Sequence, residues 1–206
     1  MTCGLILAAG ESRRMGSPKA LLEFQGEIFL DRLIGLFSRR CSPVIAVLGA
    51  DQETVRAGLR RAGEALIVEN PAFRLGQLSS MQCGLRAMPA DADGVLFTLV
   101  DHPVVASATI DALLDLGGSA PLRIPRYDGR RGHPIWISRS VVPQFLALPP
   151  ASSAKEVVTQ HAGETACIDV DDPGILADID DPAAYHRLIT EPRLTDPRPS
   201  GSGSLP

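Results

Sequence analysis

Short apolar runs alternate with amphipathic stretches along most of this chain, and this alternation restricts the fold more than any other feature. Such a pattern is typical of a mostly parallel sheet covered by helices. The run Gly94–Val100 is apolar enough to be a central strand buried on both faces. A length of 206 residues suits one domain with a proper core. We therefore predict a single Rossmann-like, three-layer α/β domain with a mostly parallel central sheet.

The predicted strands are the apolar runs, and the predicted helices are the amphipathic stretches. The strands are Gly4–Ala8, Pro43–Leu48, Ala65–Val68, Gly94–Val100, Leu122–Pro125, Pro134–Ser138 and Ala166–Val170. The helices are Ile28–Arg39, Gln52–Ala62, Ser79–Met88, Ala108–Leu116, Ala154–His161 and Pro182–Ile189. The domain is expected to span residues 1–190. Residues 191–206 are rich in proline, glycine and serine, which predicts a disordered tail.

Composition excludes several classes of function. A net charge of −4 argues against a general nucleic-acid or anionic-membrane surface, so an anionic ligand must be held by local groups of cations. The four cysteines are scattered without metal-ligand spacing, which indicates reduced thiols in a cytoplasmic protein. No apolar run approaches the roughly 20 residues needed to span a bilayer, and no basic segment of a secretory signal begins the chain.

The segment LAAGESRRMGSPK (Leu7–Lys19) directly follows the first predicted strand and combines glycines with Arg13, Arg14 and Lys19. Free backbone amides and fixed cations in one short loop suit a triphosphate. The spacing fits neither the Walker loop GxxxxGK[ST] nor the dinucleotide fingerprint GxGxxG. We therefore predict a phosphate-binding loop of another kind, and a solvated loop with incidental arginines is the alternative.

This loop fits the pattern LAAGxSxRMGxxK of the MobA-like nucleotidyltransferases at every fixed position, and the chain is most similar to their molybdenum cofactor cytidylyltransferase branch. The resemblance extends from Leu5 to about Tyr185 and implies a fold like that of nucleotide-diphospho-sugar transferases. It implies catalytic roles for Arg14, Lys19 and Asp101. It also implies a nucleotide site that includes Leu7, Ala8, Ala9, Gly10, Arg14 and Lys19. Guanylyl-transferring relatives carry LAGG, so Ala9 favours CTP.

A second segment, NPAFRLGQLSSMQCGL, resembles the family pattern NPxxxxGxxSSxxxGL. Gly76 permits a tight turn, and Ser79 and Ser80 are expected to cap the next helix and to offer hydroxyl groups to a nucleotide. The resemblance adds Asn70, Gly76, Ser79 and Ser80 to the nucleotide site. An ordinary helix cap remains the alternative for the two serines.

Two carboxylates are the predicted metal ligands. Asp101 ends the most buried predicted strand in LVDHP, at the edge where open α/β sheets bind ligands, and suits Mg²⁺, with Mn²⁺ as the alternative. The segment LADIDDPAAY resembles the family ending DIDxPxDY, in which Asp180, after a predicted strand, supplies a second carboxylate and Asp181 caps the last helix. The alternative for Asp101 is a helix cap, for which Ser107 is better placed. His102 is expected to be a neighbour without a role.

The segment GRRGHP (Gly129–Pro134) resembles the GHP of family members that act on the pterin cofactor. Gly132 is expected to adopt an unusual backbone angle, and the arginines and His133 to supply hydrogen-bond donors for an anionic second substrate. The predicted substrate-binding residues are Arg131, Gly132, His133 and Pro134. A plain hairpin turn with exposed arginines is the alternative.

The resemblance implies transfer of CMP from CTP to the terminal phosphate of molybdopterin or the molybdenum cofactor, with release of pyrophosphate. A recipient molybdoenzyme or its chaperone is the expected partner. Three alternatives stay open at this point. They are a related nucleotidyltransferase that uses another nucleotide or a sugar or alditol phosphate, a nicotinamide-nucleotide-dependent oxidoreductase on the same fold, and a non-catalytic chaperone.

Overall fold

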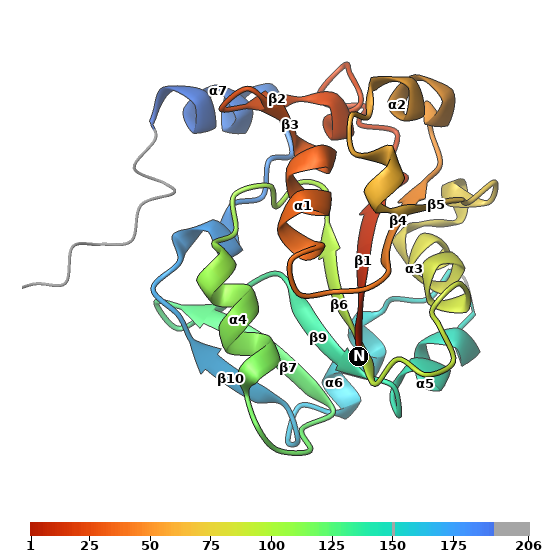
Figure 1. Cartoon of the computed structure of the whole chain (residues 1–206), viewed down its shortest axis with the longest axis vertical. Coiled ribbons are helices and arrows are strands. Elements are labelled where there is room, and N and C mark those ends of the chain that lie inside the picture. The colour runs from red at the N-terminus through yellow and green to blue at the C-terminus, as the bar shows by residue number, and fades with distance from the viewer. Residues whose placement is uncertain (150, 192–206) are drawn as a thin grey trace, which may run out of the picture.

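A mixed eight-stranded sheet runs through the computed structural model, which describes residues 1–149 and 151–191 (Figure 1). The strand order is β10-β7-β9-β6-β1-β4-β5, and β8 pairs with β7. Strand β1 is parallel to both of its neighbours, β4 and β6, whereas β9 is antiparallel to β6 and β7. The strands are β1 (Thr2–Ala8), β4 (Val44–Leu48), β5 (Leu66–Glu69), β6 (Gly94–Leu99), β7 (Leu122–Tyr127), β8 (Arg130–Arg131), β9 (Ile135–Ser138) and β10 (Ala166–Asp169).

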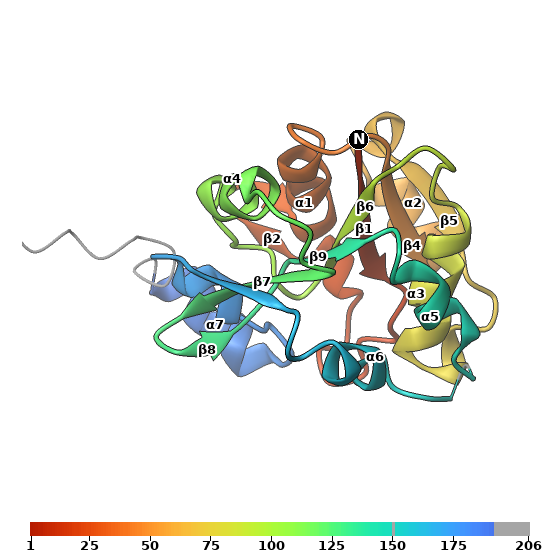
Figure 2. The ribbon, with the colours of Figure 1, turned by 90° about the horizontal axis from the view of Figure 1, so that it is seen from below.

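Helices cover both faces of this sheet. They are α1 (Phe29–Phe37), α2 (Gln52–Gly58), α3 (Gln77–Arg86), α4 (Ser107–Asp115), α5 (Val142–Ala147), α6 (Lys155–Gln160) and α7 (Pro182–Thr190). Successive side chains of β1 point to opposite faces of the sheet. Ile6 belongs to a hydrophobic core that includes residues of α1 and α4, and Leu5 belongs to a second core that includes residues of α3 and α5. Figure 2 shows these helix pairs on opposite sides of the strands. The predicted three-layer α/β architecture is confirmed.

All the predicted strands and helices are present, with ends that differ by a few residues. Two expected caps are wrong. Helix α3 begins at Gln77 with Gly76 at its N-cap, so Ser79 and Ser80 lie inside the first turn, and α4 has Ala106, not Ser107, at its N-cap. Asp181 does cap α7, accepting a hydrogen bond of 2.8 Å from the Ala184 amide.

The sequence analysis misses helix α5 and a small hairpin formed by β2 (Glu23–Phe24) and β3 (Glu27–Ile28). It also misses 3₁₀ helices η1 (Lys19–Leu21), η2 (Ala62–Glu64), η3 (Phe73–Leu75) and η4 (Pro173–Leu176). The predicted disordered tail lies outside the described residues, apart from Glu191. Within the described part of the chain, every helix is too short or too polar to serve as a membrane span.

The segment from Asp172 to Asp180 runs along the carboxyl edge of the sheet and positions the site. The buried Asp172 carboxylate accepts hydrogen bonds from the Ala106 amide at 2.8 Å and the Thr109 hydroxyl at 2.6 Å, which tie the start of η4 to α4. Further along, the Ile179 amide donates to the Asp101 carbonyl at 2.9 Å. These bonds bring the DID segment (residues 178–180) against the end of β6.

Candidate functional site

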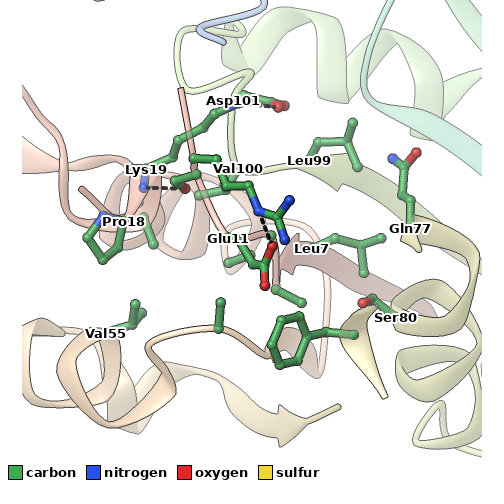
Figure 3. A pocket seen from close by; sticks show the side chains of 18 of the residues that line it. Leu7, Glu11, Pro18, Lys19, Val55, Gln77, Ser80, Leu99, Val100 and Asp101 are labelled. Atoms are coloured by element: carbon green, nitrogen blue, oxygen red, sulfur yellow. Dashed lines mark hydrogen bonds and ion pairs between the residues drawn. The ribbon is translucent and has the colours of Figure 1, made fainter. Parts of the chain in front are cut away.

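A cavity of about 630 Å³ lies where β1 and β6 end (Figure 3). This is the carboxyl edge of the parallel strands, where open α/β sheets bind their ligands. Many residues predicted for the nucleotide and metal sites line this cavity. They are Leu7, Ala8, Ala9, Gly10, Arg14, Lys19, Gly76, Ser80, Asp101 and Asp180. The structure adds residues that the sequence analysis did not assign, among them Glu11, Ser12, Val55, Phe73, Arg74 and Gln77.

The two sides of the cavity differ in chemistry. Figure 3 shows Pro18 and Lys19 on one side, and Leu7, Leu99 and Gln77 on the other. The first side is formed by the cation-rich loop, which suits phosphate groups. The second side combines apolar walls with an amide and a hydroxyl, which suits a flat heterocyclic base. The cavity therefore has the chemistry of a nucleotide site.

Lys19 is the centre of an ion-pair cluster at the cation-rich side. Its ammonium lies 3.2 Å from Oδ2 of Asp101 and also pairs with Oδ1 of Asp180, and Arg14 lies 2.5 Å from Oδ2 of Asp180. Burial opposes the charge on Lys19, but the two carboxylates outweigh it, so its pKa is raised. The Lys19 ammonium in turn lowers the pKa of Asp180. The cations predicted to bind phosphate thus neutralise the predicted metal ligands.

Ser12 holds the loop from Gly10 to Lys19, which is predicted to bind phosphate, in shape. Its backbone adopts a left-handed φ of 47°, and its carbonyl accepts hydrogen bonds from the amides of Met15 and Gly16. Its hydroxyl accepts a hydrogen bond of 3.0 Å from the Lys19 amide. The sequence analysis assigns no role to this serine, although it is a fixed position of the loop pattern.

Asn70 and Ser79 lie behind the cavity wall. The Asn70 amide group donates to the hydroxyls of Ser79 and Ser80, each at 3.0 Å, and its oxygen accepts from the Ala72 amide at 3.0 Å. The Ser79 hydroxyl donates back to the Gly76 carbonyl at 2.8 Å. Of this group, Gly76 and Ser80 face the cavity. Asn70 therefore aligns the first turn of α3, and its predicted contact with a nucleotide would be indirect.

The predicted substrate-binding residues Arg131, Gly132, His133 and Pro134 lie outside the cavity wall. Arg131 is exposed on β8, opposite Arg126 of β7. The expectation of an unusual backbone angle at Gly132 is wrong, because its φ lies outside the left-handed range. A Cβ atom at Gly132 would instead lie 2.3 Å from the Ile175 carbonyl oxygen, so the glycine permits close packing against η4.

His133 lies beside the end of β6. Its amide donates to the Ile175 carbonyl at 3.0 Å, and its ring packs edge-on against Phe97 with centroids 5.6 Å apart. The rings of His133 and His102 lie 4.7 Å apart and are tilted by 34°. The GHP segment (residues 132–134) and the strand end that carries Asp101 are therefore neighbours, although the sequence analysis treats them as separate sites.

Ligand atoms of Asp101, His102 and Asp178 all lie within 4.8 Å of one another, so these three residues could hold a metal ion. Oδ1 of Asp101 is buried and accepts no hydrogen bond from the described residues. Burial lowers the pKa of His102 to about 4, which keeps the imidazole neutral. The pKa of Asp178 is raised by burial and then by the charges of Asp101 and Asp180. These donors fit a divalent cation.

The two metal ligands predicted from the sequence have different positions in the structure. Asp101 belongs to the group of converging donors, whereas Asp180 pairs with Lys19 and Arg14 and follows an irregular segment after η4, not a strand. His102 and Asp178 complete the group. The sequence contained a sign of Asp178 as a candidate ligand, because the first and third residues of the DID segment are both acidic.

Comparison with known proteins identifies the family. Residues 4–165 match the model of the MobA-like NTP transferase domain. The chain belongs to this family. It is 25% identical to the molybdenum cofactor cytidylyltransferase of Escherichia coli, over 93% of this chain and 96% of that protein. It is 29% identical to the purine catabolism protein PucB of Bacillus subtilis, over 88% of this chain and 93% of that protein.

Among solved structures, Rv0371c of Mycobacterium tuberculosis is similar to this chain with a TM-score of 0.79 and 28% identity, over 91% of this chain and 97% of that one. A complex of Rv0371c with manganese matches with a TM-score of 0.72 and 27% identity, over 92% of this chain and 98% of that one. The chain is thus a nucleotidyltransferase of the MobA-like family. The relatives carry different names at similar identity, so they do not decide its substrates.

Proposed function

We propose that this nucleotidyltransferase transfers CMP from CTP to the terminal phosphate of molybdopterin or the molybdenum cofactor and releases pyrophosphate. The observation that carries the proposal is the two-sided cavity, which joins the cation-rich loop to a base pocket bordered by Ala9. The similarity to the E. coli cytidylyltransferase over nearly its whole length supports it. A recipient molybdoenzyme or its chaperone would take the product.

The triphosphate is proposed to lie on the loop from Gly10 to Lys19, with its α-phosphorus toward the incoming phosphate. Arg14 is mostly exposed and free to turn from Asp180 to a phosphate oxygen, while Lys19 lies deeper, with a side chain that is 13% exposed. Such transfer needs no protein nucleophile, because it proceeds by positioning and by neutralisation of developing charge. Arg14 and Lys19 supply that neutralisation.

Asp101 is proposed to hold the divalent cation, either Mg²⁺ or Mn²⁺, that this chemistry uses. When bound there, the cation would neutralise phosphate charge. Asp180 is the proposed second carboxylate, available once Lys19 has turned toward the triphosphate. Oδ1 of Asp101 is buried and receives no hydrogen bond from the part of the chain that the structure describes, which supports this assignment.

The preference for CTP rests on the packing around Ala9. This residue is 4% exposed, and its carbonyl accepts a hydrogen bond of 3.1 Å from the Ala50 amide. A Cβ atom at Gly49 would lie 2.9 Å from the Ala9 methyl and 2.7 Å from Cβ of Phe73, so this side of the pocket is already closely packed. We propose that the Ala9 methyl narrows the base pocket, which would favour a pyrimidine over a purine.

The second substrate is proposed to approach from the GHP segment. His133 contacts His102, the residue next to Asp101, and Arg131 is exposed on the adjoining strand β8. An anionic pterin bound along Arg131, Gly132, His133 and Pro134 would bring its phosphate toward the end of β6. This placement puts the second substrate and the nucleotide on two sides of Asp101.

Pyrophosphate release with each of the four ribonucleoside triphosphates, with and without purified molybdopterin cofactor, tests the proposal. We expect release that needs both CTP and cofactor, loss of that release in Asp101→Asn, and normal release in Asp91→Asn, a change at an exposed aspartate remote from the cavity. Release with a sugar phosphate or another nucleotide would overturn the proposed substrates. NADPH oxidation without pyrophosphate release would overturn the reaction class.

A further inference from the structure

The two carboxylate oxygens of Asp101 have different surroundings. Oδ2 lies 3.2 Å from the ammonium of Lys19. Oδ1 is buried, receives no hydrogen bond from the described residues, and lies 3.9 Å from Nε2 of His102. A buried carboxylate oxygen without a partner is costly, so Oδ1 calls for a positively charged or hydrogen-bonding ligand. Such a ligand can bind at Oδ1 while Lys19 stays on Oδ2.

His102 is held in place by its surroundings. The residue is 8% exposed, and its amide donates to the Leu99 carbonyl at 3.2 Å in the turn that ends β6. Its ring packs on that of His133, which is fixed in turn by Phe97 and by the hydrogen bond to Ile175. A buried imidazole with a fixed ring plane is preorganised to donate a nitrogen lone pair. The GHP segment thus supports the His102 ring.

Asp178 completes the arrangement from a distant part of the sequence. The hydrogen bond from the Ile179 amide to the Asp101 carbonyl places the preceding residue beside β6. Around this point three carboxylates, Asp101, Asp178 and Asp180, face two cations, Lys19 and Arg14. The cluster therefore carries a surplus of negative charge, which a divalent cation would offset.

We propose that Asp101, His102 and Asp178 form a divalent-cation site with one nitrogen ligand, and that this ligand makes the site prefer transition-metal ions such as Mn²⁺ to Mg²⁺. The proposal rests on the proposed function only in that a cation bound at Asp101 would serve the nucleotide. Mg²⁺ takes oxygen ligands, whereas first-row transition metals also bind imidazole. Two ligands that are each about 2.1 Å from an ion are at most about 4.2 Å apart, so donor atoms within 4.8 Å need only a small closure.

Mn²⁺ binding to the metal-free full-length chain, measured without nucleotide, tests this proposal. Electron spin echo envelope modulation of the Mn²⁺ complex should show coupling to a ¹⁴N nucleus. His102→Asn should abolish this coupling, lower the affinity for Mn²⁺ at least about tenfold and change the affinity for Mg²⁺ much less. His186→Asn, at an exposed histidine on α7, is the matched control and should leave both properties unchanged.

Asp178→Asn should weaken the binding of Mn²⁺ and Mg²⁺ alike, because it removes a charged oxygen ligand that both ions use. Absence of nitrogen coupling in the wild-type Mn²⁺ complex would overturn the proposal whether or not the variants fold. Equal losses of Mn²⁺ and Mg²⁺ affinity in His102→Asn would overturn the preference. No substrate is present in these measurements, so a different nucleotide in the pyrophosphate assay would refute the proposed function and leave this result standing.

Discussion

Replacement of Gly132 by alanine should destabilise the protein because the GHP segment packs directly on the backbone of η4. A Cβ atom there would lie 2.3 Å from the Ile175 carbonyl oxygen and 2.7 Å from its carbonyl carbon. Backbone atoms cannot turn away as a flexible side chain can, so the segment must move. Overpacking of this kind costs about 1–3 kcal/mol. For a chain of this size the loss corresponds to a fall in Tm of roughly 2–12 °C.

Thermal unfolding followed by circular dichroism measures this loss. Gly163→Ala is the matched control, because a Cβ atom at Gly163 would point into open space and the φ of this glycine is outside the left-handed range. We expect the control to stay within about 0.5 kcal/mol of the wild type. Turnover, measured where both variants are folded, should fall in Gly132→Ala alone, since the added methyl group presses on Ile175 of η4, which leads to Asp178 and Asp180. If Gly132→Ala is as stable as the wild type, the packing role is refuted, and substrate binding is the remaining proposed role of this glycine.

Three further changes test the nucleotide site. Lys19→Ala should cost about 2.7–4 kcal/mol of transition-state stabilisation in the steady-state kinetics of pyrophosphate release, whereas a higher KM for CTP at constant kcat would limit Lys19 to ground-state binding. Ala9→Gly should lower the ratio of kcat/KM for CTP to that for GTP by widening the base pocket, and an unchanged ratio would show that Ala9 does not read the base. Asn70→Ala should lower the free energy of unfolding in urea by about 1–3 kcal/mol, because it leaves buried partners of the amide unpaired. If stability holds and the KM for CTP rises, Asn70 instead contacts the nucleotide.

The strands were predictable because their signal is local. β6 is apolar at almost every position, and a run of that kind inside a 206-residue chain can only be a buried element. Helix α5 was not predicted, because its six residues span less than two turns and contain a proline, so they give no clear helical pattern. Each strand of the β2–β3 hairpin has only two residues. The hairpin depends on positive φ angles at Gln25 and Gly26, which the sequence analysis did not predict.

The site was predictable where its residues are consecutive. The loop from Leu7 to Lys19 lines the cavity as one segment, so a sequence pattern contains most of its geometry. The position of Asp178 depends on a hydrogen bond between Ile179 and Asp101, and no local pattern encodes such a long-range contact. The burial of His102 against the GHP segment is likewise a tertiary property. The helix-cap prediction for Ser79 and Ser80 fails because Gly76, with φ of 111°, starts the helix earlier.

On the proposed function, the ion pairs that join Lys19 and Arg14 to Asp101 and Asp180 would couple the binding of triphosphate to the binding of the divalent cation. A triphosphate that draws the two cations away would leave carboxylates with higher affinity for a divalent cation, and a cation that engages Asp180 would release Lys19 and Arg14 for phosphate. Linkage requires that each ligand raise the affinity for the other by the same factor. Calorimetric titration of CTP with and without Mg²⁺ measures that factor, and a value of one would show that the ion pairs persist when both are bound. A cooperative site of this kind discriminates against free nucleotide and free metal in favour of the metal–nucleotide complex.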